Sequence, residues 1–95
     1  MVVTLGIFRF TKFMNQIINE PVKVAGVFKH SLFKPVWFEW SNQRLKISKI
    51  TFITDYKQGL VKHKIYSVIA QGNLYRLLFN TNNLDWTLES VWLDG

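Results

Sequence analysis

The sequence predicts an all-β protein, a single small antiparallel meander of about six strands curled into a barrel or half-barrel. From residue 20 onward, apolar side chains recur with a period of two, which is typical of strands that bury one face. Short polar segments with turn-forming residues separate these alternating runs. With 95 residues, 48% of them hydrophobic and 16% aromatic, the chain can fill one core and is too apolar for disorder.

The first residues are expected to lie outside this sheet. Residues 1–19 are interpreted as an N-terminal extension, either a short helix or a segment that covers a sheet edge, ahead of a β domain at residues 20–95. A second methionine, Met14, leaves open whether residues 1–13 belong to the native chain. No basic residue precedes the apolar start, and no apolar run is long enough to cross a bilayer. A cytoplasmic protein with no membrane partner is therefore expected.

The first two strands are expected at residues 22–28 and 36–40, each directly after a proline. Gly26 interrupts the first of them, which predicts a bulge or bend there. In the second strand, Trp37 lies on the face opposite to the apolar even-numbered positions. Its ring is therefore either exposed or packed against the N-terminal segment.

A polar break after residue 40 predicts a hairpin. A two-residue loop at Asn42–Gln43 would create three favourable cross-strand pairs, namely Trp40 with Leu45, Phe38 with Ile47, and Glu39 with Lys46. The alternation slips beyond Ile47, which predicts a bulge near residues 48–49 and a strongly bent strand. Bent strands of this kind allow a small sheet to curl into a barrel.

The second half of the domain is expected to contain the last strands of the meander. Residues 55–64 are interpreted as an exposed loop or the flared end of a hairpin. Residues 65–70 and 74–79 flank a Gly-Asn turn signal, and residues 86–92 form the final strand. The strand parity predicts that four large aromatic side chains fill the core: Phe38, Trp40, Trp86 and Trp92.

The charge of the chain is positive and unevenly distributed. Twelve Lys and Arg residues oppose six Asp and Glu residues, which gives a formal net charge of +6 and a pI near 9.9. Every basic residue lies at or before Arg76. A basic surface with exposed rings suits single-stranded nucleic acid, because cations meet phosphates and rings stack on bases. The alternative interpretation is a solvated rim that serves solubility.

We therefore expect a nucleic-acid interface built from cations and rings. The predicted phosphate contacts are Arg44, Lys46, Lys49, Lys57, Lys62, His63, Lys64 and Arg76. The predicted stacking rings are Trp37, Tyr56 and Tyr66.

Catalytic and metal-binding patterns are missing from the sequence. There is no cysteine, the two histidines are far apart, and the carboxylates are spread along the chain. No phosphate loop, nucleophile elbow or zinc-protease motif is present. The sequence thus predicts a non-catalytic module without metal or cofactor that binds nucleic acid. The alternative is a protein-interaction module that takes a partner by strand addition or on an exposed aromatic patch. A homo-oligomer formed by pairing sheet edges is compatible with either.

Residues 35–93 contain an apolar-aromatic hairpin with Phe38-Glu-Trp40 and Leu45-Lys-Ile47, a Leu74-Tyr-Arg-Leu77 strand, and a terminal Trp-x-Leu-x-x-Val-Trp strand that ends at Trp92. This combination resembles a family of small bacterial all-β proteins with no established activity, some of which occur near error-prone polymerases. The resemblance implies the same fold and a nucleic-acid setting. The chain differs at Thr54-Asp-Tyr56, where many relatives carry a tryptophan.

Overall fold

The computed structural model describes residues 13–94 and shows one antiparallel sheet without helices. Its seven strands are β1 (Phe13–Pro21), β2 (Lys23–Lys29), β3 (Leu32–Trp40), β4 (Gln43–Gln58), β5 (Val61–Ala70), β6 (Asn73–Asn80) and β7 (Trp86–Asp94). The predicted all-β meander is confirmed, with seven strands rather than six. The additional strand is β1, which forms within the segment interpreted as an extension. The rest of that segment, residues 1–12, lies outside the described residues.

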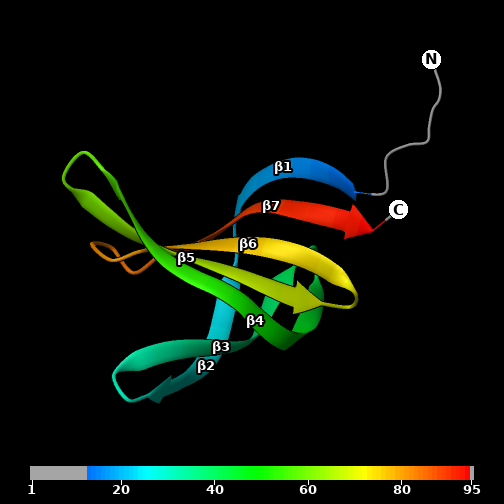
Figure 1. The fold of residues 1–95 in the computed structure, drawn as a ribbon, viewed down its shortest axis with the longest axis horizontal. Coiled ribbons are helices and arrows are strands. Elements are labelled where there is room, and N and C mark those ends of the chain that lie inside the picture. The colour runs from blue at the N-terminus through cyan, green and yellow to red at the C-terminus, as the bar shows by residue number, and fades with distance from the viewer. Residues whose placement is uncertain (1–12, 95) are drawn as a thin grey trace.

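The strand order is β1-β7-β6-β5-β4-β3-β2, so β1 and β2 form opposite edges of the sheet. These two strands are nevertheless consecutive in the chain, with only Val22 between them. The Val22 amide donates a hydrogen bond to the Trp86 carbonyl oxygen at 3.1 Å. The chain therefore joins the two edges of the sheet, which curls into an open half-barrel (Figure 1).

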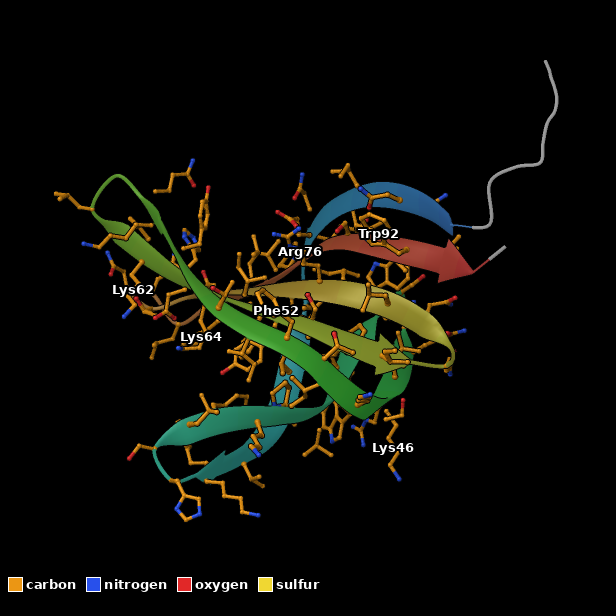
Figure 2. The ribbon with its side chains drawn as sticks, viewed as in Figure 1. Lys46, Phe52, Lys62, Lys64, Arg76 and Trp92 are labelled. Atoms are coloured by element: carbon orange, nitrogen blue, oxygen red, sulfur yellow. The ribbon has the colours of Figure 1, made fainter. Side chains whose placement is uncertain are left out.

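Two hairpins project beyond the curled part of the sheet. One is β2–β3, and the other is the far end of β4–β5, where Lys62 and Lys64 lie (Figures 1 and 2). They separate because β3 pairs with β4 only over Trp37–Trp40, so that the rest of β3 pairs with β2 alone. The long β4 continues with β5 as far as Gln58.

The predicted bulge at Gly26 is confirmed. The β2–β3 register shifts between Ala25 and Gly26, which leaves Val36 as the extra residue on β3. At this point the two backbones approach so closely that a Cβ on Gly26 would collide with the Lys34 carbonyl oxygen and lie 2.7 Å from the Pro35 Cα. Only glycine fits this position.

The β3–β4 hairpin is present, but the predicted loop position is wrong by one residue. The loop is Ser41–Asn42, and both residues have positive φ, at 54° and 61°. Two consecutive positive φ values are characteristic of the tight hairpin turn that matches the twist of a sheet. The observed partners are Phe38 with Leu45, Glu39 with Arg44, and Trp37 with Lys46.

The predicted bulge in β4 near residues 48–49 is confirmed, and a second one follows. The β4–β5 register shifts between Ile47 and Lys49 and again between Ile50 and Phe52. At each shift a hydroxyl donates a hydrogen bond to a β5 carbonyl oxygen, Ser48 to that of Ile69 and Thr51 to that of Ser67, both at 3.1 Å. These bonds hold the strand in its bent path.

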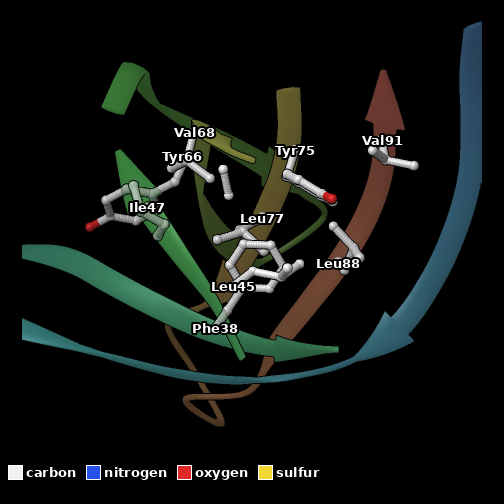
Figure 3. Close-up of a cluster of buried hydrophobic side chains, with 10 residues drawn as sticks. Phe38, Leu45, Ile47, Tyr66, Val68, Tyr75, Leu77, Leu88 and Val91 are labelled. Atoms are coloured by element: carbon white, nitrogen blue, oxygen red, sulfur yellow. The ribbon is translucent and has the colours of Figure 1, made fainter. Parts of the chain in front are cut away.

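The core lies inside the curl of the sheet (Figure 3). Its most deeply buried side chains are Tyr66, Phe38, Leu45, Leu77, Leu88, Val68 and Val91. Of the four predicted core aromatics, Phe38 is fully buried, and Trp40 and Trp86 are half-buried against the core.

The prediction that Trp92 belongs to the core is wrong, because its side chain is 38% exposed. The β6–β7 register shifts between Arg76 and Leu77, so Glu89 is an extra residue in β7. This bulge reverses the parity of the strand beyond it. Val91 takes the inner position, and Trp92 points outward.

Gly26→Ala is expected to destabilise the fold by about 3 kcal/mol, because the new methyl group meets backbone that cannot move aside. Denaturant unfolding measures the loss. The matched control is Gly59→Ala, where open space surrounds the site and the positive φ of 62° alone costs about 1 kcal/mol. Equal losses at the two glycines would contradict the close approach at Gly26.

Candidate functional site

The sheet has an outer face that points away from the core. Phe52, Ser67, Arg76, Ser90 and Ile17 are successive cross-strand partners on β4, β5, β6, β7 and β1. Directly opposed residues share one face of a sheet, so these five side chains lie on the same side. We call this side the outer face.

A second row crosses the outer face beside the first. It consists of Lys49, Ile69, Leu74 and Trp92, followed by Asn15 of β1. Tyr56 lies further along β4, on the same face as Phe52. Figure 2 labels Phe52 on β4, Arg76 on β6 and Trp92 on β7.

Several large apolar side chains of the outer face are exposed. Phe52 is 58% exposed, Tyr56 42% and Ile17 65%, in addition to Trp92. Within the described residues, no helix or second sheet covers this face. Isolated exposed hydrophobic residues are ordinary, and the feature of these side chains is that they share one face of the sheet.

Two cations lie on the outer side of β4: Lys49 is in the row beside that of Phe52, and Lys46 is opposite Trp37 of β3. Lys46 and Lys49 are exposed, and Leu45, Ile47 and Ile50 turn toward the core between and beyond them. None of the ion pairs among residues 15–93 includes Lys46 or Lys49. Within this part of the chain, no carboxylate neutralises the two ammonium groups.

Arg44 and Trp37 form a unit of their own at the start of β4. The Arg44 guanidinium carbon lies 3.9 Å from the centre of the Trp37 ring, and its Nη2 is 3.2 Å from Glu39 Oε2. Glu39 thus pairs with Arg44 and not with Lys46, as the shifted loop requires. Because Trp37 is half-buried and Arg44 covers its ring, this tryptophan is not an open stacking ring.

The other predicted lysines lie elsewhere. Lys62 and Lys64 are on the projecting part of β5, on the inner side of the sheet, and Lys57 is the cross-strand partner of Lys62. The Asp55 carboxylate accepts a hydrogen bond from Lys64 Nζ at 2.8 Å and lies 3.5 Å from Lys62 Nζ. The hydrogen bond from Lys64 and the charges of both lysines lower the pKa of the Asp55 carboxyl group.

His63 and Arg76 are on the outer face, each with a neighbour. The His63 ring lies 5.6 Å from the Tyr56 ring, and its Nδ1 is buried without a hydrogen-bond partner in the described part of the chain. Arg76 Nε is 3.1 Å from Glu89 Oε1. The Arg76 side chain is 44% exposed, so it can contact a ligand while it keeps this carboxylate.

Tyr66 is not a stacking ring, and this prediction is corrected. Its side chain is 1% exposed, and its hydroxyl donates a hydrogen bond to the Phe33 carbonyl oxygen at 2.8 Å. Burial, with a smaller contribution from the negative charge of Asp55, raises the pKa of the Tyr66 phenol. Tyr66 is the cross-strand partner of Ile53. Tyr66 belongs to the core, and Ile53 packs against it.

The residues that sequence reasoning missed are Phe52 and Trp92. Ile50 and Phe52 are two residues apart, the spacing of side chains that share one face of a regular strand, but the extra residue Thr51 puts them on opposite faces. Trp92 has the same parity as Leu88 in the sequence, and the extra residue Glu89 turns it to the opposite face. At these two positions, unlike at Ser48, no slip in the period-two pattern showed that the strand gains a residue.

The chain was compared with family models, with curated proteins and with solved structures, and no match was found. The family resemblance and its implied nucleic-acid setting therefore stay predictions. Among residues 13–94, no cluster of His, Asp and Glu could hold a metal ion. The same residues form no helix that is long and apolar enough to span a membrane.

The carboxyl pKa of Asp55, followed by NMR titration, is expected below its usual value, and Lys64→Gln should raise it. A lowered pKa in the folded state stabilises the protein above the usual carboxyl pKa, and this contribution is lost as the pH falls through the lowered value. Lys46→Gln removes the same charge at a site without a carboxylate and should leave the Asp55 pKa unchanged. If both variants behave alike, the Lys64–Asp55 pair is not formed.

Proposed function

We propose that the outer face binds single-stranded nucleic acid without catalysis. The observation that carries this proposal is the placement of three exposed aromatic rings, Phe52, Tyr56 and Trp92, on one sheet face that no element of the described residues covers. Lys46 and Lys49 lie along the same side of β4.

The rings would supply most of the contact with bases. Stacking of a base on an aromatic side chain contributes about 1–3 kcal/mol and does not depend on base identity, because every base has a flat face. Phe52 of β4 is in the first row of the outer face, and Trp92 of β7 is in the second. An extended nucleic-acid strand can therefore cross the sheet from one ring to the other. Aromatic rings on an open sheet face bind unpaired RNA bases in this manner.

The cations would hold the phosphates. Lys46 and Lys49 carry no ion pair in the described chain and can each neutralise one phosphate. Arg76, at the centre of the face, shares its charge with Glu89. This arrangement predicts affinity that falls with salt and has little sequence preference.

The proposed interface is smaller than the set of residues predicted from the sequence. Lys57, Lys62 and Lys64 belong to the inner side of the projecting hairpin, and Lys62 and Lys64 share the Asp55 carboxylate. They raise the local potential and can steer an anionic strand, but the outer face does not need them for contact.

Phe52→Ala is expected to weaken binding of a fluorescent single-stranded oligonucleotide about tenfold, because one stacking ring is lost. Lys46→Glu combined with Lys49→Glu should weaken it further and flatten the dependence of affinity on salt. Fluorescence anisotropy at low and near-physiological salt measures both effects.

The matched controls are Phe28→Ala and the double variant Lys29→Glu with Lys34→Glu, which make the same chemical changes at exposed positions of the β2–β3 hairpin. They should leave affinity close to that of the parent protein. Absence of binding at low salt, or equal losses in the control variants, would refute the outer-face interface.

A second candidate function is supported by the edge strand β2. Val27 and Phe28 are 54% and 77% exposed on a strand that pairs with β3 on one side only. An extended peptide could add to this edge and place apolar side chains against Phe28. Such binding would depend little on salt and would be lost in Phe28→Ala and kept in Phe52→Ala, the reverse of the pattern above.

A further inference from the structure

A cavity of about 250 Å³ lies on the inner side of the sheet, beneath the β2–β3 hairpin. One wall comes from the hairpin and the other from β5, β6 and β7. The lining residues are Phe28, Ser31, Leu32, Phe33, Lys64, Tyr66, Phe79 and Trp86. β3 pairs with β4 only over Trp37–Trp40. The part of the β2–β3 hairpin that precedes Trp37 therefore stands away from β4, and the cavity lies in the space between.

The walls of this cavity are aromatic. Trp86 is the central ring, with centroid distances of 4.8 Å to Phe79, 5.3 Å to Tyr66 and 5.7 Å to Phe33. Phe28 extends the cluster through an edge-on contact with Phe33 at 5.2 Å. A flat ring entering this space would find partners for stacked and edge-on contacts.

Tyr66 has no free hydrogen-bond donor for a ligand in the cavity. The Tyr66 hydroxyl already donates to the Phe33 carbonyl oxygen, and the remaining polar groups of the lining, Ser31 and Lys64, belong to residues that are exposed or half-buried. A nucleobase would bury its polar edge against apolar walls, at a cost in free energy. An apolar ring has no polar edge to bury and would not incur this cost.

Lys64 gives the cavity a positive charge at its lining. Two ammonium groups, of Lys62 and Lys64, share the single carboxylate of Asp55, so one positive charge remains in excess. The Lys64 side chain is only 28% exposed, it belongs to the lining of the cavity, and its ammonium group lies 2.8 Å from Asp55 Oδ1. An anionic substituent on a bound ring would be attracted here.

We propose that this cavity binds a small planar aromatic ring that carries a carboxylate, such as a phenyl or indolyl acid. The volume suits a ligand of this size, since apolar cavities of about 150 Å³ accept benzene and typical drug-sized sites exceed about 300 Å³. The ring contacts Trp86, Phe79 and Phe33, and the carboxylate meets Lys64. The site is independent of the outer face.

The test is an NMR titration of the isotope-labelled protein with indole-3-acetate, with indole and adenosine monophosphate as comparison ligands. Saturable shifts are expected at the amides of Phe33, Phe79 and Trp86. Lys64→Gln should weaken indole-3-acetate about threefold and leave indole unchanged, because only the acid uses the charge. Phe28→Ala, at a 77% exposed position, should weaken both ligands without disturbing the fold.

Three results would overturn the proposal. They are the absence of saturable shifts at millimolar indole-3-acetate, equal losses of indole and indole-3-acetate in Lys64→Gln, and tighter binding of adenosine monophosphate than of indole-3-acetate. Phe52→Ala serves as the reference for independence from the outer face. It should leave indole-3-acetate binding unchanged, whether or not the protein binds nucleic acid.

Discussion

The bending of β4 at two bulges is the constraint on which the rest of the structure depends. The shifts at Ser48 and Thr51 change which side chains of the strand face inward, and the two hydroxyls hold the bends by hydrogen bonds to β5 carbonyl oxygens. Without the second bulge, Phe52 would have the parity of Ile50 and turn toward the core. The same bends curl the sheet, so that Phe38 from β3 can pack against Tyr75 of β6, with ring centroids 5.1 Å apart.

The curled sheet separates two surfaces with different chemistry. The outer face combines exposed rings with the cations Lys46 and Lys49, which have no ion pair among the described residues. The inner side contains a partly open aromatic cavity beneath the β2–β3 hairpin, with the cation Lys64 in its lining. The two surfaces differ because one is open and polar at its edges, whereas the other is bounded by a hairpin that the Gly26 bulge bends.

Much of this fold can be predicted from the sequence, because strands with one buried face have a period of two. The strands from β2 to β7, the bulges at Gly26 and Ser48, and the burial of Phe38 follow from that pattern. Strand β1 was missed because its alternation is weak.

The candidate site was harder to predict, since it depends on parity after bulges and on which charges pair. Thr51 and Glu89 each shift a register without a local sequence signal, and this placed Phe52 and Trp92 on the outer face. A count of charged residues also does not show which of them form ion pairs. Asp55 is opposite Lys64 because of the register of the β4–β5 hairpin. Tyr66 is buried because its ring packs in the core and its hydroxyl bonds to the Phe33 carbonyl oxygen of the β2–β3 hairpin.

The central claim is that a nucleic-acid strand contacts the outer face and leaves the inner side free. NMR chemical-shift mapping with a short single-stranded oligonucleotide tests this claim most directly, because one spectrum reports on both surfaces. The account predicts shifts at Lys46, Lys49, Phe52, Tyr56 and Trp92, with the amides around Phe33 and Phe79 unchanged. Shifts confined to the β2–β3 hairpin and the aromatic cavity would contradict it.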